Sequence, residues 1–232
     1  ALPIEGIVIL DRIDPSGIHY WVVFGPGGGD VNIAVRYDYE SRSGITAYIA
    51  WNKNEAARLL NAEATKFWVI VNFNGPQSRE AFEQFVKDYH MEVIEYSMRA
   101  IEPPTPLTPE GNRVTAIGAP HHSALIPDDL FNTMFHNVTG ERGATFKGWI
   151  TVRGGVDREG FQKLQSDPRV AVVEVIETIG RQALQVNRDK LIGADPQLLR
   201  ALNTDEPYFR IQIDGPPLYW KLEDFGLVPK DY

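Results

Sequence analysis

The chain of 232 residues lacks cysteine altogether, and it also lacks any long apolar run. Without cysteine there can be no disulfide bond, thiolate metal site, iron–sulfur cluster or cysteine nucleophile. No stretch approaches the ~18 consecutive apolar residues that a membrane-spanning helix requires. We therefore expect neither thiol chemistry nor a transmembrane segment in this sequence.

The start of the chain bears on its location. It begins with ALPIEG and without a methionine, which is typical of a segment that follows a removed signal or a membrane anchor. We interpret this start as favouring the extracytoplasmic part of a bacterial envelope protein, with a membrane anchor upstream. A cytosolic location is left open by the same residues.

The sequence also has fewer basic than acidic residues. Lysine and arginine number 23 against 31 aspartate and glutamate residues, so the formal net charge is −8, and no basic run interrupts this acidity. Nucleic acids and anionic membranes bind proteins chiefly through phosphates that basic side chains neutralise. We therefore expect no nucleic acid as a partner.

Strong catalytic and cofactor motifs are also missing. The glycine-rich loop at residues 25–30, GPGGGD, has no Lys-Ser/Thr pair and leads into a strand-like run, unlike a phosphate-binding loop, which leads into a helix. No serine lies in a G-x-S-x-G pattern. These deficits favour a non-enzymatic protein, and we predict no cofactor.

The main positive feature is an internal repeat between residues 68–99 and 149–181. Three blocks recur: a tryptophan-led strand, an Arg-Glu-x-Phe helix start and a Glu-Val-Ile-Glu strand. Their offsets are 81 (149 − 68), 79 (158 − 79) and 82 (174 − 92), so length changes fall between blocks, where loops are expected. Ser78 and Asp157 are the predicted N-caps of the two helices. We predict two duplicated halves, each with a βαβ unit.

The fold class that follows is α+β or mixed α/β, with ferredoxin-like layering of helices on sheets. Four apolar bursts before the first repeat predict an N-terminal region of antiparallel strands. These bursts lie at residues 7–10, 18–24, 31–39 and 45–51.

A proline-rich segment at residues 103–112 is the predicted boundary between two domains, because proline at this density favours an extended linker. The N-terminal domain, residues 1–102, would contain the strands and the first repeat, 67–101. The C-terminal domain, residues 113–232, would contain the second repeat, 148–184, followed by a strand and helices.

Four charged residues are candidates for ligand binding. Glu95 and Arg99 are four apart on a predicted strand, so both side chains project to one face, and Glu177 and Arg181 repeat this arrangement. A cleft between the two pairs could hold a small molecule or a protein segment. The alternative is that they are the solvated charges of two strands, in ion pairs worth less than ~1 kcal/mol each.

A second hypothesis is a metal-dependent enzyme. Histidines and aspartates gather within sixteen residues, and these side chains are common ligands of zinc and iron. The candidate ligands are His121, His122, Asp128, Asp129 and His136. Their spacing differs from the helical pair of histidines in known zinc motifs. We favour a binding or interaction module of unknown partner, with a divalent metal only under the enzyme hypothesis.

Overall fold

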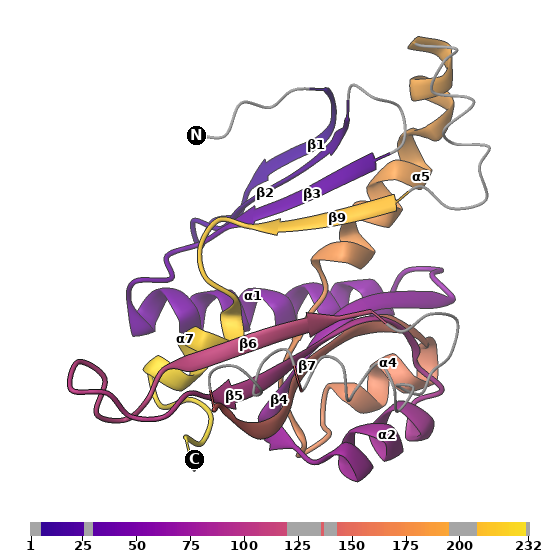
Figure 1. Ribbon diagram of the computed structural model, residues 1–232. Coiled ribbons are helices and arrows are strands. Elements are labelled where there is room, and N and C mark those ends of the chain that lie inside the picture. Colours follow the sequence, from indigo (N-terminus) through magenta and orange to yellow (C-terminus); the bar gives the residue numbers. More distant parts are fainter. Residues whose placement is uncertain (1–5, 26–29, 120–135, 137–142, 195–207, 231–232) are drawn as a thin grey trace. The chain divides into compact units, whose positions relative to one another are not determined.

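The computed structural model describes residues 6–25, 30–119, 136, 143–194 and 208–230 (Figure 1). It confirms the predicted mixed α+β class, with one four-stranded and one five-stranded sheet. The chain forms two compact units. Unit 1 comprises Ala1–Glu55 and Val175–Lys221, and unit 2 comprises Ala56–Glu174 and Leu222–Tyr232.

The elements of unit 1 come from both ends of the chain. They are β1 (Ile7–Ile13), β2 (His19–Phe24), β3 (Asp30–Arg36), the first part of α1 (Arg42–Leu60), α5 (Ile176–Ala194), β9 (Tyr208–Ile213) and the start of α7 (Leu218–Asp224). The sheet order is β1-β2-β3-β9, in which the first three strands are antiparallel and β9 is parallel to β3.

Helix α5 packs on this sheet at an unusually close approach. A Cβ atom on Gly180 would lie 2.3 Å from Cδ1 of the buried Ile33 on β3, so only glycine fits here without a shift of the isoleucine. Next to it, the Arg181 guanidinium lies 4.0 Å from the ring centroid of Phe209 on β9. The helix therefore covers the sheet through a glycine contact and a cation–π contact.

The strand predicted at residues 45–51 is wrong, because these residues begin helix α1. The buried side chains Ile45, Tyr48, Asn52 and Leu59 follow a spacing of three, four and seven residues. This spacing matches the 3.6-residue period of an α-helix and buries one stripe. The short window of 45–51 was too brief to separate that period from strand alternation.

Unit 2 contains a single sheet of antiparallel neighbours, in the order β6-β5-β7-β4-β8. Its elements are β4 (Lys66–Gln77), α2 (Arg79–Asp88), β5 (Glu92–Ile101), β6 (Arg113–Gly118), β7 (Thr145–Asp157), α4 (Arg158–Leu164) and β8 (Val170–Glu174). It also holds the ends of α1 and α7. Both predicted βαβ units therefore share one sheet instead of forming separate domains.

The two helices of these βαβ units begin at the predicted caps. Ser78 Oγ accepts a hydrogen bond from the Ala81 amide, and Asp157 Oδ1 accepts one from the Gly160 amide. Each helix then stacks a phenylalanine on the strand of the other βαβ unit. Phe82 of α2 lies 5.2 Å from Trp149 of β7, and Phe161 of α4 lies 4.3 Å from Phe67 of β4.

The third repeat block does not form matching strands. In the first copy Glu92-Val93-Ile94-Glu95 begins β5, whereas in the second copy the chain leaves β8 at Glu174 and starts α5 at Ile176. Register gives a different correspondence between the copies. Val71 of β4 and Val152 of β7 are paired at the centre of the sheet and occupy equivalent positions in the two copies. On its other side Val71 pairs with Val173 of β8, and Val152 pairs with Tyr96 of β5. Tyr96 and Val173 are therefore equivalent at an offset of 77 (173 − 96), whereas the identical sequence blocks have an offset of 82.

The identical four residues adopt different structures because their tertiary surroundings differ. In the second copy Val175, Ile176 and Ile179 are all buried at helical spacing, and the buried Asn52 accepts a hydrogen bond from the Val175 amide through Oδ1 at 3.0 Å. Burial and this bond favour a helix start over a strand. Common ancestry of the two copies and the ferredoxin-like comparison stay predictions.

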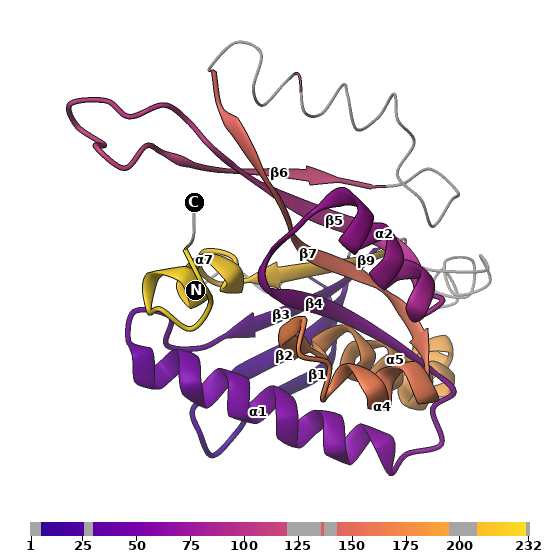
Figure 2. The same ribbon diagram turned by 90° about the horizontal axis from the view of Figure 1, so that it is seen from below.

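The linker predicted at residues 103–112 differs from what the structure shows. This segment is the loop of the hairpin formed by β5 and β6, and both strands belong to unit 2. Figures 1 and 2 show the hairpin extending beyond the end of the sheet. Pro103 and Pro104 follow the end of β5, and hydrogen bonds within the loop fold the segment back on itself instead of extending it between two domains.

Candidate functional site

The four predicted ligand-binding residues lie in two different units. Glu95 and Arg99 are on β5 of unit 2, and their side chains share a face of the sheet. Glu177 and Arg181 are on α5 of unit 1 instead of a strand, where Arg181 Nη2 donates to Glu177 Oε1 at 2.8 Å. A ligand site shared by the two pairs stays a prediction.

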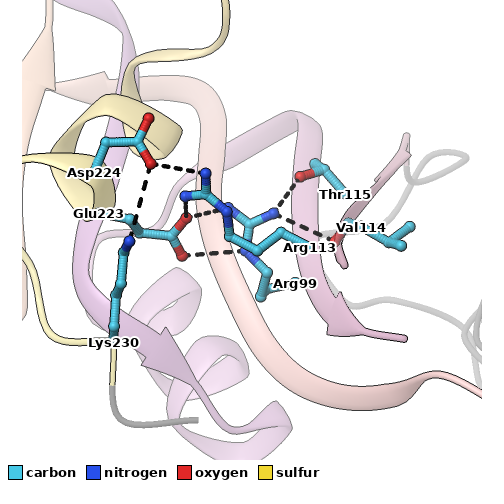
Figure 3. Close-up of polar contacts among 7 residues, drawn as sticks. All are labelled: Arg99, Arg113, Val114, Thr115, Glu223, Asp224 and Lys230. Carbon is cyan, nitrogen blue, oxygen red and sulfur yellow. Dashed lines mark hydrogen bonds and ion pairs between the residues drawn. The ribbon is translucent and has the colours of Figure 1, made fainter. Parts of the chain in front are cut away.

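Arg99 forms a buried ion pair with Glu223, near the end of α7. Its Nε donates to Glu223 Oε1 at 3.1 Å and its Nη2 donates to Oε2 at 2.6 Å (Figure 3). Both side chains are fully shielded from solvent. This two-bond geometry is the strongest form of a charge-assisted hydrogen bond between arginine and a carboxylate.

The remaining guanidinium nitrogen of Arg99 is bound to the neighbouring strand. Nη1 donates to Thr115 Oγ1 at 2.8 Å and to the Val114 carbonyl at 3.4 Å, both on β6. Arg99 therefore joins the second strand of the hairpin to the C-terminal helix. An external anion at this point would have to displace Glu223, because its carboxylate already accepts from two of the guanidinium nitrogens.

A second arginine ties the base of the hairpin to the same helix. Arg113 is the first residue of β6, opposite Ile101, and it donates to Glu223 Oε2 at 2.9 Å and to Asp224 Oδ1 at 2.7 Å. Lys230 Nζ lies 3.9 Å from Asp224 Oδ1, and Figure 3 marks this ion pair by a dashed line. We call this set, Arg99, Arg113, Glu223 and Asp224, the hairpin anchor.

The anchor lies on the polar face of the sheet, opposite the face that α2 and α4 cover. One row of paired residues crosses this face from β5 to β8. Glu95 of β5 pairs with Arg153 of β7. Arg153 pairs with Ile70 of β4, and Ile70 pairs with Glu174 of β8. The buried Asn72 donates to Glu174 Oε1 at 2.8 Å. Buried polar groups of this kind specify one arrangement of the strands, because the folded protein is less stable when such a group lacks its hydrogen-bond partner.

Beyond the anchor, the hairpin ends in a tight turn of Thr105, Pro106, Leu107 and Thr108. The two threonines exchange backbone hydrogen bonds of 3.0 and 3.1 Å, and their hydroxyl groups lie 2.8 Å apart. Proline at the second position is favoured because its fixed φ suits such a turn. Leu107, at the third position, is 92% exposed.

The loop between the turn and the anchor is also held by internal bonds. The Glu102 amide donates to the Asn112 carbonyl at 2.9 Å, and the Gly111 amide donates to the Thr108 carbonyl at 2.9 Å. Gly111 has a φ of +80°, and a Cβ atom there would lie 2.2 Å from the Glu102 carbonyl oxygen. Only glycine therefore fits this position, and the loop that carries Leu107 is closed by its own hydrogen bonds.

A separate charged cluster joins the end of α2 to the loop before β8. Tyr89 donates its hydroxyl to Asp167 Oδ2 at 2.6 Å, and Arg169 Nη2 donates to the same oxygen at 2.7 Å. Burial and the nearby carboxylate raise the pKa of Tyr89 to about 12. Burial opposes ionisation of Asp167, but the bonds from Arg169 and Tyr89 outweigh it and lower the pKa of this carboxyl.

Most of the predicted metal ligands lie outside the described residues. His121, His122, Asp128 and Asp129 are among them, and the remaining candidate, His136, is exposed. Within the part of the chain that the structure describes, no group of three or more such side chains could hold a metal ion. The metal-dependent hypothesis stays a prediction.

Three residues of the hairpin region were not predicted from the sequence: Leu107, Arg113 and Glu223. One signal was available for Leu107, because a large apolar residue within a run of four prolines and two threonines suits an exposed turn. Glu223 lies 124 residues from Arg99 in the chain, and no local pattern links positions so far apart.

Comparisons with protein families, with curated proteins and with solved structures found no match for this chain. Among the helices of the described ranges, none is long and apolar enough to cross a membrane.

We predict that Arg99→Met lowers the free energy of unfolding by about 3 kcal/mol, because it leaves a buried carboxylate short of its main partner. The double variant Arg99→Met with Glu223→Leu should lose less than the two single variants added together, because neither charge is then left buried. Urea unfolding of the four proteins measures this coupling.

The matched control is Lys163→Met, which breaks the exposed pair that Lys163 forms with Glu159 at 2.6 Å. Exposed pairs of this kind contribute less than ~1 kcal/mol. A loss for Arg99→Met no greater than the loss for Lys163→Met would contradict the anchoring role of Arg99.

We also predict that the stability difference between the protein and its Tyr89→Phe variant depends on pH. Because the pKa of Tyr89 in the folded protein is about 12, above the ordinary value of ~10, the folded state holds the phenolic proton more tightly. This contribution is complete below pH ~10 and is lost as the pH rises towards ~12. Unfolding measured from pH ~8 to ~12 should therefore show a shrinking difference, and a constant difference would refute the prediction.

Proposed function

We propose that this chain is a non-enzymatic binding module whose contact element is the hairpin of β5 and β6, and whose partner is another protein. The proposal depends on one observation: Leu107 is 92% exposed at the tip of a loop whose backbone is closed by its own hydrogen bonds. The transfer of a large apolar side chain from water into an apolar pocket lowers the free energy, so a side chain in this position can anchor an interface.

The rigidity of the hairpin supports a binding role. Binding normally orders flexible loops, which costs free energy, and a loop that is already ordered avoids this cost. Here prolines restrict the backbone, and the hairpin anchor joins the base of the loop to α7 through buried and partly buried ion pairs.

The charge of the hairpin indicates the kind of protein that it fits. The charged residues between the two strands, Glu102 and Glu110, are both acidic. An apolar pocket with a basic rim would complement Leu107 and these carboxylates, whereas an anionic membrane would repel them. The proposed partner is therefore a protein surface of that chemistry.

The location of the module in an extracytoplasmic compartment stays a prediction from the sequence, as does the alternative of a metal-dependent enzyme.

A photocrosslinking experiment tests the binding role. The amino acid p-benzoylphenylalanine replaces Leu107 in one protein and Val186 in another, because Val186 of α5 is an aliphatic residue of comparable exposure, 80%. Both proteins are irradiated in the cells that naturally produce the chain. We expect one dominant protein adduct at position 107 that is not formed at position 186.

A stability measurement separates binding from folding. Leu107→Asp should leave the free energy of unfolding within about 0.5 kcal/mol of the parent, because the side chain is exposed, while it abolishes the adduct partner's binding to the purified protein. The same adducts at both positions, or no adduct at position 107, would reject the proposed function.

A further inference from the structure

Five aromatic side chains of unit 1 form a row of neighbouring rings that runs from β2 through α1 to the segment after β3. The ring centroids of Tyr20 and Trp51 lie 5.2 Å apart, and those of Trp51 and Tyr48 lie 5.8 Å apart. Tyr48 stacks on Tyr37 at 3.9 Å, and Tyr37 lies 6.5 Å from Tyr39. The first four rings are buried, and Tyr39 is partly exposed. We call this set the aromatic row.

Packing alone does not explain the residue types of the aromatic row, because every member is a tyrosine or a tryptophan. A buried phenol or indole carries a polar group that needs a hydrogen-bond partner, whereas a phenylalanine of similar shape carries none. Helix α4 of unit 2 packs on its sheet through such a contact, with Phe161 at 4.3 Å from Phe67. Tyrosine and tryptophan differ from phenylalanine in the ease with which their rings lose one electron.

The central pair of the row departs from the arrangement that aromatic packing favours. Aromatic pairs prefer offset or edge-to-face contacts, with ring centroids about 4.5–7 Å apart. The rings of Tyr37 and Tyr48 are nearly parallel, at 3°, and their centroids are only 3.9 Å apart. Two rings stacked in this way share a positive charge, so the pair loses an electron more easily than a single ring.

The buried and the exposed parts of the row differ in where a proton can go. Trp51 Nε1 is buried and has no hydrogen-bond acceptor among the described residues. An indole oxidised at this position keeps its proton, because the N–H can only donate and no acceptor is present, and it remains a strong oxidant. Tyr39 is partly exposed, so its oxidised phenol releases the proton to water. Electrons therefore move from Tyr39 towards Trp51.

We propose that the aromatic row transfers electrons from Tyr39 to the buried rings of unit 1 and so moves oxidative damage to the surface. The oxidant is an oxygen-centred radical, such as the hydroxyl radical, which takes one electron from Trp51 and becomes hydroxide. An electron from Tyr39 passes through Tyr37 and Tyr48 to Trp51, and the phenolic proton of Tyr39 passes to water. A thiol in solution then gives a hydrogen atom to the phenoxyl radical, which restores the phenol and leaves a thiyl radical.

The absence of cysteine from the chain allows an oxidant to be placed at the far end of the row. Arg12 is an exposed residue of β1 that pairs with Tyr20, so Arg12→Cys supplies a single thiol for a ruthenium photo-oxidant. Light and a cobalt(III) quencher convert the attached complex to ruthenium(III), which takes one electron from the protein. A nitroso spin trap adds to the resulting tyrosyl radical, and peptide mass spectrometry locates the adduct. We expect the adduct at Tyr39.

Phenylalanine variants separate transfer along the row from direct transfer between the label and Tyr39. Tyr48→Phe keeps the ring but removes the phenol, and we expect the Tyr39 adduct to be lost. Tyr37→Phe should have the same effect. The matched control is Tyr96→Phe, which changes a buried tyrosine of unit 2 and should leave the adduct unchanged. Circular dichroism confirms that each labelled protein is folded.

A mixing experiment identifies transfer within one molecule. Labelled protein is irradiated together with isotope-labelled protein that carries no ruthenium, and the adduct should form only on the Tyr39 peptide of the ruthenium-bearing molecule. The inference is overturned by the absence of an adduct at Tyr39, by equal yields in the parent and both row variants, or by equal yields on the two proteins of the mixture. None of these outcomes bears on the hairpin of β5 and β6, which the crosslinking experiment tests separately.

Discussion

The buried ion pair between Arg99 and Glu223 is the interaction on which the position of the β5–β6 hairpin depends. Both side chains are removed from solvent, so neither can lose its partner without leaving an uncompensated charge. The pair joins β5 to the end of α7, and Arg113 extends it to the base of β6. Its importance is geometric more than energetic, because a buried pair contributes little net stability compared with apolar side chains of the same size.

Much of unit 2 could be predicted from its sequence because the signals were local. The caps Ser78 and Asp157, and the apolar runs of β4 and β7, lie within a few residues of the structure they specify. The third repeat block shows the limit of this reasoning. Glu-Val-Ile-Glu begins a strand in one copy and spans a helix start in the other, since burial and the bond from Val175 to Asn52 decide between two structures of similar intrinsic preference.

The candidate site was harder to predict, because it depends on residues far apart in the chain. Glu95 and Arg99 were identified as charged residues on one strand face, but the partner of Arg99 lies in the last helix. The prolines of residues 103–112 indicated an extended linker, and the reciprocal bonds between Thr105 and Thr108 instead fold the segment back on itself. Turn closure of this kind depends on hydrogen-bond geometry that composition does not contain.

We infer that the hairpin anchor keeps the β5–β6 loop in one conformation. Hydrogen exchange of the backbone amides tests it most directly, with Glu223→Gln compared to the parent. We expect the bonded amides of Glu102, Thr105, Thr108 and Gly111 to be protected in the parent and to exchange markedly faster in the variant. Amides in the β4–β7 ladder should keep their protection. Equal exchange of the hairpin amides in both proteins would contradict the claim.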